Sequence, residues 1–421
     1  MQLYIFVTLT IYDMGGVQCY VASKAKFLRE NGWNVKILYP GVRKPKTQFK
    51  ELNRYLDGNV IEIGYTPSIY SMNVLNRILG KVLNILGDTQ KYESIIIESH
   101  DDITSQWGEI IANKIGAKHI ILLMNEIYRG LNKHYEEKIE FYKFKFQRKE
   151  ILGAEATISR LFEGYGFDKN NINTLIIDEN PVQDVMNEKL DRIQKAQYNI
   201  CYIGRSNKPY VPAIIGGVKE FAKKNSNSSI QFILVSNTMP VRNIINDELN
   251  SVDNLTVTEL GEMVPIPKEL FRRVDVVVAG SGSARCSALE GVLTIVAEPE
   301  LCKSIGILGI DTQESVYWDK ESKCSSFSEA LDDVLIKRIY DGKKIKIDYM
   351  GVTECTKQNF EAIQKSEKKQ EYYLLDKLCY GKKKFYPFLK IKFFLMQKNP
   401  KIFSIVNKIV MILKRYLLLW R

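Results

Sequence analysis

Short runs of β-branched and other apolar residues alternate with polar breaks and amphipathic segments through the first half of the chain. Unbroken apolar runs of this length are typical of parallel strands that are buried on both faces. Residues 17–31 carry apolar side chains at helical spacing, and strands are predicted at 3–10, 35–39, 94–98, 119–124, 154–158 and 174–177. This alternation predicts a Rossmann-like α/β domain over residues 1–186.

A second series of the same kind begins at Asn199, although no sequence repeat relates the two halves. Strands are predicted at 199–203, 230–235, 254–258, 274–279 and 294–297, and helices at 213–224 and 266–273. We therefore expect a second Rossmann-like domain over residues 187–350, joined to the first near residues 187–197. The carboxyl ends of the strands in both halves are expected to line one cleft, because open α/β sheets bind ligands there.

The amino-acid composition of the chain changes after this second series of strands and helices. Residues 351–378 include a polar helical pattern, which we expect to form a helix that crosses back to the first domain. Residues 379–421 mix Lys and Arg with Phe, Leu and Trp, and the apolar stretch 402–420 is broken by Asn407, Lys408, Lys414 and Arg415. A spanning helix needs roughly 20 mostly apolar residues, so this pattern favours a basic amphipathic helical tail in a membrane interface. Docking of the tail on the protein itself is the alternative.

The net charge of +11 is concentrated at the C-terminal end. Residues 377–421 hold twelve Lys and Arg and no Asp or Glu, and the rest of the chain has 48 basic and 49 acidic residues, a net charge of −1. A nearly neutral body argues against a nucleic-acid partner bound in a basic cleft. An anionic membrane surface is the expected partner of the tail.

The cysteines and the N-terminus indicate the compartment. Seven cysteines are scattered without a CxxC pair, which indicates neither a zinc site nor a disulfide framework and favours a reducing environment. The first residues lack a basic n-region and are predicted to form a strand instead of a signal peptide. We expect a cytoplasmic protein that its tail holds peripherally on the inner face of the cell membrane.

Residues 274–292 carry the most specific chemistry. A buried strand runs into Gly280-Ser281-Gly282, and helix-forming residues follow, with Ser283 expected as the N-cap. A glycine turn at a helix N-terminus presents backbone N–H groups and the positive end of the helix dipole, which together can cradle a diphosphate. Glu290, two turns past Ser283, could accept ribose hydroxyls. An ordinary tight turn is the alternative, and Arg285 at the third glycine position argues against a nicotinamide site.

Other polar residues follow predicted strands. Arg205 and Lys208 come directly after a strand, where they could reach the same diphosphate as bidentate and point cations. Gly15 and Gly16 follow the first strand, and His100 and Glu126 follow two later ones. His119 and His134 are interpreted as non-catalytic, and no metal-ligand cluster or Ser/His/Asp arrangement stands out.

Four stretches, in this order, resemble the GT-B glycosyltransferases of family 4: GGVQ at 15–18, ENPV at 179–182, YIGRSNK at 202–208 and GSGSARCSALEG at 280–291. The resemblance implies a GT-B fold and transfer of a sugar, with retention and without metal or cofactor, from a nucleotide-diphosphate-sugar donor to a saccharide or lipid-linked hydroxyl acceptor. It implies three groups of site residues: catalytic Arg205, Lys208 and His100; donor-binding Gly15, Gly16, Gly282, Ser283, Arg285 and Glu290; and Glu126 on the acceptor side. The setting it implies is bacterial capsule, lipopolysaccharide or exopolysaccharide synthesis.

One difference from the family's sequence pattern leaves two alternative functions open. The first glutamate of the family's E-x7-E signature falls on Gly282, and in the family that glutamate contacts the transferred sugar. A catalytically degenerate GT-B scaffold that recruits a partner transferase is therefore the second hypothesis. A GT-B sugar-nucleotide epimerase, which would convert the donor without any acceptor, is the third.

Overall fold

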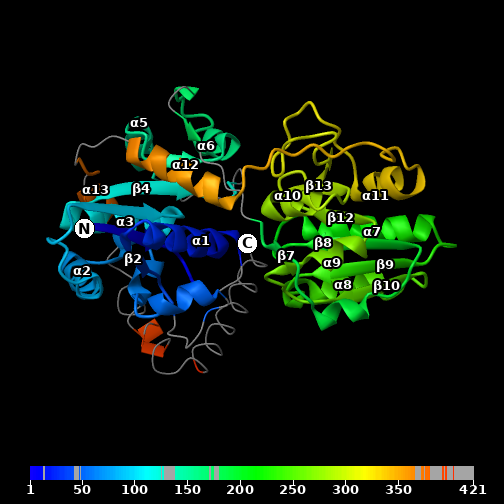
Figure 1. Cartoon of the computed structure of the whole chain (residues 1–421), viewed down its shortest axis with the longest axis horizontal. Coiled ribbons are helices and arrows are strands. Elements are labelled where there is room, and N and C mark those ends of the chain that lie inside the picture. The colour runs from blue at the N-terminus through cyan, green and yellow to red at the C-terminus, as the bar shows by residue number, and fades with distance from the viewer. Residues whose placement is uncertain are drawn as a thin grey trace, which may run out of the picture. The chain divides into compact units, whose positions relative to one another are not determined.

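The computed structural model describes residues 1–12, 15–41, 47, 49–124, 126–127, 138–169, 172–174, 180–365, 371–373, 375–379, 391–392, 394–395 and 402. The chain divides into two compact units (Figure 1). Unit 1 comprises residues 1–125 and 133–176 and the chain from Thr356 onward. Unit 2 comprises residues 126–132 and 177–355. Most of the tail expected at 379–421 lies outside the described residues.

Unit 1 is built on a parallel sheet with the strand order β2-β1-β3-β4-β5-β6. The strands are β1 (Gln2–Val7), β2 (Trp33–Leu38), β3 (Ser94–Ser99), β4 (Lys118–Leu123), β5 (Ile151–Gly153) and β6 (Asn173–Thr174). The chain runs from β1 to β2 on one side of β1 and then crosses from β2 to β3 on the other side, so the topological switch point lies between β1 and β3.

The helices of unit 1 are α1 (Gly16–Glu30), α2 (Met72–Leu86), α3 (Asp102–Ile115), α5 (Ile139–Gln147), α6 (Glu155–Leu161), α13 (Leu375–Cys379) and, from Thr356 onward, α12 (Val352–Lys365), with 3₁₀ turns at Lys50–Tyr55, Ile61–Gly64 and Pro67–Ile69. Helix α12 packs on the sheet through Phe360, whose ring centroid lies 5.3 Å from that of Trp33 and 6.4 Å from that of Tyr4. The Nζ of Lys118 donates to the Ile363 carbonyl at 2.8 Å. Residues near the end of the chain therefore complete the first unit.

Unit 2 has a sheet with the order β10-β9-β8-β12-β13-β14, in which only β14 is antiparallel to its neighbour. Its strands are β8 (Tyr198–Ile203), β9 (Ile230–Val235), β10 (Leu255–Glu259), β12 (Val276–Ala279), β13 (Thr294–Glu298) and β14 (Lys303–Ile307), beside a small sheet of β7 (Val182–Gln183) and β11 (Ile266–Pro267). Its helices are α7 (Val211–Lys224), α8 (Arg242–Leu249), α9 (Lys268–Arg272), α10 (Ser281–Leu289) and α11 (Phe327–Leu331), with 3₁₀ turns at Glu188–Arg192 and Met239–Val241 and a π-helical turn at Asp332–Ile336.

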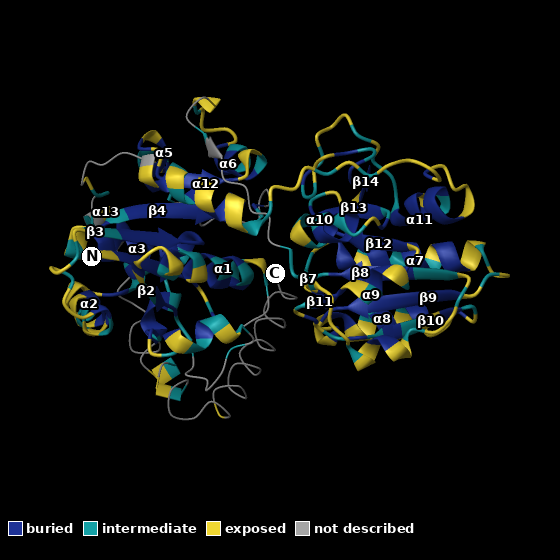
Figure 2. Cartoon of the chain, viewed as in Figure 1, coloured by how far each residue is buried: buried dark blue, intermediate teal, exposed yellow. Residues whose placement is uncertain are grey.

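Alternation along the central strands sorts the core of unit 2 into two layers. Ile200 and Tyr202 pack with α7, α8 and α11 on one face, whereas Cys201 and Ile203 pack with α9 and α10 on the other. Both faces of the sheet are therefore covered, and the central strands β9 and β12 are dark blue along their length in Figure 2. Burial on both faces explains why the sequence shows unbroken apolar runs here.

The predicted α/β class with parallel sheets is confirmed, but two local predictions are wrong. Residues 154–158 were expected to form a strand, and the structure has helix α6 there, after the three-residue strand β5. Ala and Glu in this stretch are helix formers, and the strand is too short to stand out. Ser283 is not the N-cap of α10, because the strand ends directly at Gly280, which takes the cap position.

Candidate functional site

The switch point of unit 2 lies between β8 and β12, where the order of connections reverses. Tyr202 on β8 pairs in register with Val278 on β12. The residues that follow these strands, Gly204-Arg205 and Gly280-Ser281, are therefore neighbours at the carboxyl edge of the sheet. The structure thus brings together two stretches that the sequence analysis selected separately, at the position where doubly wound sheets bind ligands.

Two glycines at this edge face tyrosine hydroxyls. A Cβ on Gly204, whose φ is 154°, would lie 2.8 Å from the hydroxyl of Tyr202. A Cβ on Gly280 would lie 2.9 Å from the hydroxyl of Tyr210 and 3.0 Å from the Ala297 carbonyl. Both glycines are needed for this close approach. The two tyrosines carry no sequence signal for this contact, because each fits the pattern of an ordinary core residue.

The tyrosine hydroxyls hold the loop that carries Arg205. The hydroxyl of Tyr202 donates to the Arg205 carbonyl at 2.9 Å, and the side chain of Tyr210 hydrogen-bonds to Tyr202. Burial raises the pKa of Tyr202, and the nearby Glu126 carboxylate adds to this shift. The phenol therefore stays protonated and serves as a donor to the loop.

The cations of this loop differ in their surroundings. Lys208 forms an ion pair with Glu126, and these side chains are only 13% and 11% exposed. Burial lowers the pKa of Lys208, and the Glu126 carboxylate opposes that shift while the Arg205 charge adds to it. Arg205 is exposed, and no described residue forms an ion pair with its guanidinium. Arg205 is therefore available to an anionic ligand, whereas Lys208 is already neutralised.

Glu126 belongs to unit 2, and its expected place on the acceptor side stays a prediction. Its neighbour Ile127 is fixed there by Tyr317, whose hydroxyl accepts from the Ile127 N–H at 2.7 Å and donates to the Ile127 carbonyl at 3.2 Å. Glu126 therefore lies beside Arg205 and Lys208, although more than 75 residues separate it from them in sequence. Sequence alone gave no signal for this contact.

The N-terminus of α10 lies at the same edge. Its N-cap Gly280 provides no side-chain cap, and the Ser281 N–H, at a φ of 57°, donates to the Ser315 carbonyl. Gly282 is exposed, and a Cβ there would meet no atom within 4 Å. The N–H groups of the first turn have no intrahelical acceptor, so this open end can receive an anion.

The remaining donor-side predictions lie further along α10. Arg285 donates from Nη2 to the Asp348 carbonyl at 2.9 Å. Glu290 is the C-cap, nine residues past Ser281, which corresponds to about 13 Å along the helix axis. Its carboxylate lies 3.4 Å from the Nζ of Lys268 on α9. The structure therefore places Glu290 at the opposite end of α10 from the glycine turn, and its role toward a ribose stays a prediction.

In unit 1, Gly15 and His100 lie close to the β1–β3 switch point. Gly15 is the N-cap of α1, which begins at Gly16, and Gln18 ties this turn to the preceding loop by donating to the Thr10 carbonyl at 2.9 Å. His100 directly follows β3 and is 2% exposed. The next residue, Asp101, caps α3 through a capping box with Thr104.

His100 belongs to a buried polar cluster that the sequence analysis overlooked. Its Nε2 lies 2.8 Å from Oε1 of Glu98, and Oε2 of Glu98 lies 2.5 Å from Nζ of Lys24. The hydroxyl of Tyr4 donates to the same Oε2, and Lys24 donates to the hydroxyl of Tyr20 at 2.7 Å. Burial alone would raise the pKa of Glu98, but Lys24 and His100 outweigh it and lower the pKa to about 2. The cluster therefore holds an ionised carboxylate in the core.

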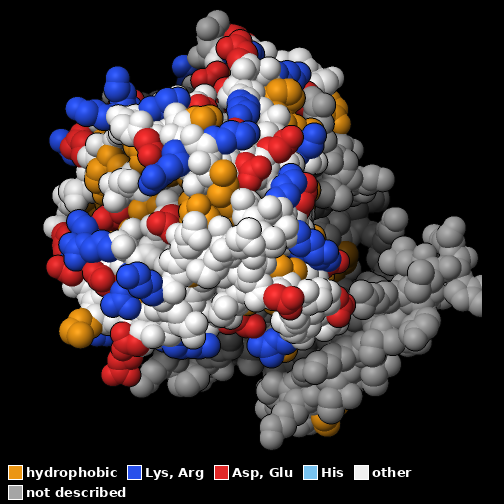
Figure 3. Space-filling view, turned by 90° about the vertical axis from the view of Figure 1, so that its right-hand side faces the viewer, with side chains coloured by type: hydrophobic (Ala, Val, Ile, Leu, Met, Phe, Trp, Pro, Cys, Tyr) orange, Lys and Arg blue, Asp and Glu red, His pale blue; other side chains and the backbone are white. Residues whose placement is uncertain are grey.

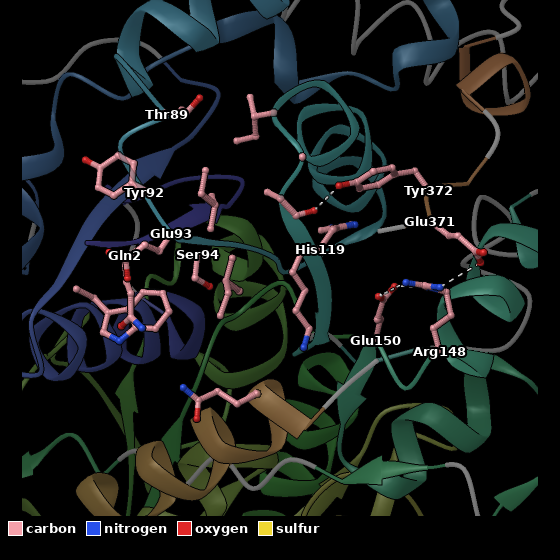
Figure 4. Close-up of a pocket in the computed structure, with 18 of the residues that line it drawn as sticks. Gln2, Thr89, Tyr92, Glu93, Ser94, His119, Arg148, Glu150, Glu371 and Tyr372 are labelled. Atoms are coloured by element: carbon pink, nitrogen blue, oxygen red, sulfur yellow. Dashed lines mark hydrogen bonds and ion pairs between the residues drawn. The ribbon is translucent and has the colours of Figure 1, made fainter. Parts of the chain in front are cut away.

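A pocket of about 620 Å³ opens at the other edge of the same sheet (Figure 4). Its walls include the first residues of three strands, Gln2, Ser94 and Lys118. Arg148 spans it between Glu150, at 3.0 Å, and Glu371, at 3.5 Å. Because ligands of doubly wound sheets bind at the carboxyl ends of strands, this pocket at the amino ends is not the candidate site.

Three further features of the described residues concern surface charge, metal binding and membrane spanning. On the face that Figure 3 displays, Lys and Arg side chains are interspersed with Asp and Glu. Among the residues that the structure describes, no group of three His, Cys, Asp or Glu side chains could hold a metal ion. None of the described helices is long and apolar enough to cross a membrane.

Comparison with known proteins gives a fold but no sequence family. No family model matches the chain. No curated protein matches it in sequence. Among solved structures, it is similar to HepE of Anabaena in complex with UDP and glucose, with a TM-score of 0.57, 13% identity and coverage of 87% of this chain and 95% of that one.

Two further solved structures are similar over most of their length. A glycosyltransferase from Rickettsia africae has a TM-score of 0.54 at 12% identity, covering 94% of this chain and 99% of that one. UDP-GlcNAc 2-epimerase from Neisseria meningitidis, bound to UDP-GlcNAc, has a TM-score of 0.50 at 16% identity, covering 87% of this chain and 100% of that one. At these identities the likeness concerns the fold alone, and the chain has the GT-B fold.

Proposed function

We propose that the protein is a glycosyltransferase that uses a nucleotide-diphosphate sugar, most simply a UDP-sugar, as donor. The observation that carries this proposal is the meeting of Gly204-Arg205 with the open N-terminus of α10 at the β8–β12 switch point. It is supported by the solved structures of the same fold that hold UDP, glucose or UDP-GlcNAc. The donor diphosphate would lie against the first turn of α10, with the guanidinium of Arg205 on its oxygens.

The chemistry of transfer fits these groups. Cleavage of the anomeric C–O bond leaves a diphosphate with new negative charge, and preorganised donors and cations aimed at that charge are usually the largest catalytic contribution. Arg205 is an exposed cation whose own loop is held by the hydroxyl of Tyr202. Arg205 and the N–H groups of Gly282 and Ser283 would stabilise the leaving group. Lys208 would act as a second, partly neutralised cation beside Glu126.

The finer assignments are parts of the same proposal. Retention at the anomeric carbon, a saccharide or lipid-linked acceptor and a role in bacterial surface-polysaccharide synthesis follow from the resemblance of the four sequence stretches to family 4 enzymes. Peripheral attachment to the inner face of the cell membrane follows from the basic amphipathic composition of residues 379–421.

A sugar-nucleotide epimerase is the second candidate, favoured by the similarity to UDP-GlcNAc 2-epimerase. Incubating the chain with a panel of UDP- and GDP-sugars, with and without hydroxyl acceptors, separates the two by chromatography of the nucleotide products. A transferase releases nucleoside diphosphate in an acceptor-dependent way. Conversion of a donor into its epimer without any acceptor would replace the transferase proposal by the epimerase.

A further inference from the structure

Unit 1 contains two chemically matched buried clusters, each made of a lysine, a glutamate and a histidine. In the first, Lys24 and His100 both contact Glu98. In the second, Lys145 and His119 both contact Glu109, at 2.9 and 2.6 Å. In each, all three side chains are at most 2% exposed. The two clusters differ at the second nitrogen of the histidine ring.

The second cluster is closed. Nδ1 of His119 faces Glu109, and Nε2 lies 3.0 Å from the hydroxyl of Ser99. Lys145 also contacts Glu150, at 2.7 Å. Both ring nitrogens of His119 therefore have partners, as expected for a structural histidine.

The first cluster is open at one atom. Nε2 of His100 faces Glu98, but no described residue offers a hydrogen-bond partner to the buried Nδ1. Glu98 is ionised and can only accept, so Nε2 carries the proton of the pair. In the neutral ring this leaves a lone pair on Nδ1. Unpaired buried polar atoms are rare in folded proteins and are a reason to look for a function.

The open histidine is also placed for a ligand, since it directly follows β3 at the β1–β3 switch point. The aromatic rings of Phe6 and Tyr20 flank it, each with its centroid 6.0 Å from that of the imidazole. His119, by contrast, is the second residue of β4, toward the opposite edge of the sheet. Strand geometry supplies the orienting group, because residues 98 and 100 are two apart and share a side of the strand path.

We propose that Lys24 and Glu98 are positioning residues that fix the tautomer of His100, so that its Nδ1 accepts a hydrogen bond from a hydroxyl group of a sugar substrate. This inference rests on the proposed function for the identity of the substrate, but the tautomer itself is a property of the chain alone. Lys24 keeps the Glu98 carboxylate charged, and the carboxylate keeps the proton on Nε2.

The first test is nitrogen NMR of the full chain with ¹⁵N-labelled histidine rings and no added ligand. The chain has three histidines, so the three rings can be assigned with H100Q, H119Q and H134Q. In its neutral form, the His100 ring is expected to show a protonated Nε2 and an unprotonated Nδ1. A proton on Nδ1 would overturn the proposal, whether or not the protein turns over any sugar nucleotide.

The second test is turnover of the charge-neutral variant K24M/E98Q against the matched control K145M/E109Q. Loss of the fixed tautomer should lower turnover by about 2- to 10-fold, the value of one hydrogen bond between neutral groups, with UDP affinity unchanged. The control should keep the parent turnover. Parent-like turnover in a folded K24M/E98Q protein would refute the positioning role. Failure of the parent chain to bind UDP would instead refute the proposed function and leave the NMR result to decide the tautomer.

Discussion

Arg205→Ala gives the most informative single substitution, because the structure separates its effect on catalysis from any effect on folding. The guanidinium is exposed and has no ion-pair partner among the described residues, so its removal orphans no charge. The loop keeps its anchor, since Tyr202 donates to the backbone carbonyl of residue 205 and not to the side chain. The free energy of unfolding should therefore change by no more than about 0.5 kcal/mol.

The effect on turnover follows from the charge that Arg205 would meet. A hydrogen bond to a charged group is worth about 1.5–3 kcal/mol, and each 1.36 kcal/mol is tenfold in rate, so turnover of the donor should fall by about 10- to 150-fold. Most of the loss should appear in kcat, because the charge on the leaving diphosphate grows in the transition state. Release of nucleoside diphosphate from a saturating donor measures it.

Arg272→Ala is the matched control for this experiment. Arg272 is also an exposed arginine of unit 2, with a side chain 69% exposed, but it lies on α9 and pairs with Glu269. Its loss should leave turnover unchanged. An Arg205→Ala protein that turns over within threefold of the parent would show that this guanidinium does not meet the reacting charge, and the proposed donor site would have to be moved.

Three further predictions address the ribose, the buried carboxylates and the tail. Glu290→Gln should weaken UDP binding by about 10- to 100-fold in calorimetry if the carboxylate holds the ribose. Unchanged affinity would mean that the carboxylate serves only the ion pair with Lys268, and would refute the ribose role. Glu98 and Glu109 each have a pKa lowered to about 2, so the stability that they contribute is present above about pH 4.5 and is lost as the pH falls toward 2. The loss measured by urea unfolding should be on the order of 3 kcal/mol for each carboxylate. A K24M/E98Q protein whose stability falls with acid as the parent's does would contradict this. The chain should float with anionic liposomes, and less of it should float as salt is added, because each surface Lys or Arg contributes about 1 kcal/mol to binding of anionic lipid. A chain truncated after Leu378 should not float. Flotation of the truncated chain would mean that another part of the protein binds the membrane.

The sequence was sufficient to find most of the long central strands. Burial on both faces makes β9 and its neighbours stand out as apolar runs, and the predicted range 230–235 matches β9 residue for residue. Short or edge elements were harder, because β5 has only three residues and the Thr and Ile within α6 also fit a strand pattern. The antiparallel strand β14 carries no local signal for its direction.

Contacts between segments far apart in the chain are the part of the candidate site that could not be predicted from the sequence. Gly204, Arg205 and Gly280 could be found from sequence because glycine turns and cations after strands have a local signature. The ion pair of Lys208 with Glu126 could not, because it joins segments far apart in the chain. Lys24 and Glu98 were overlooked for a related reason: a charged residue in a helix or strand reads as solvated until a partner is known to be buried beside it.

The central claim is that unit 2 binds a nucleotide diphosphate at the β8–β12 switch point, and calorimetric titration of the full chain with UDP and GDP tests it most directly. The account predicts saturable binding of one of the two with a Kd in a range of about 1 μM to 1 mM, weakened by Arg205→Ala and unchanged by Arg272→Ala. Binding of neither nucleotide at millimolar concentration, or equal binding by the parent and Arg205→Ala proteins, would contradict it.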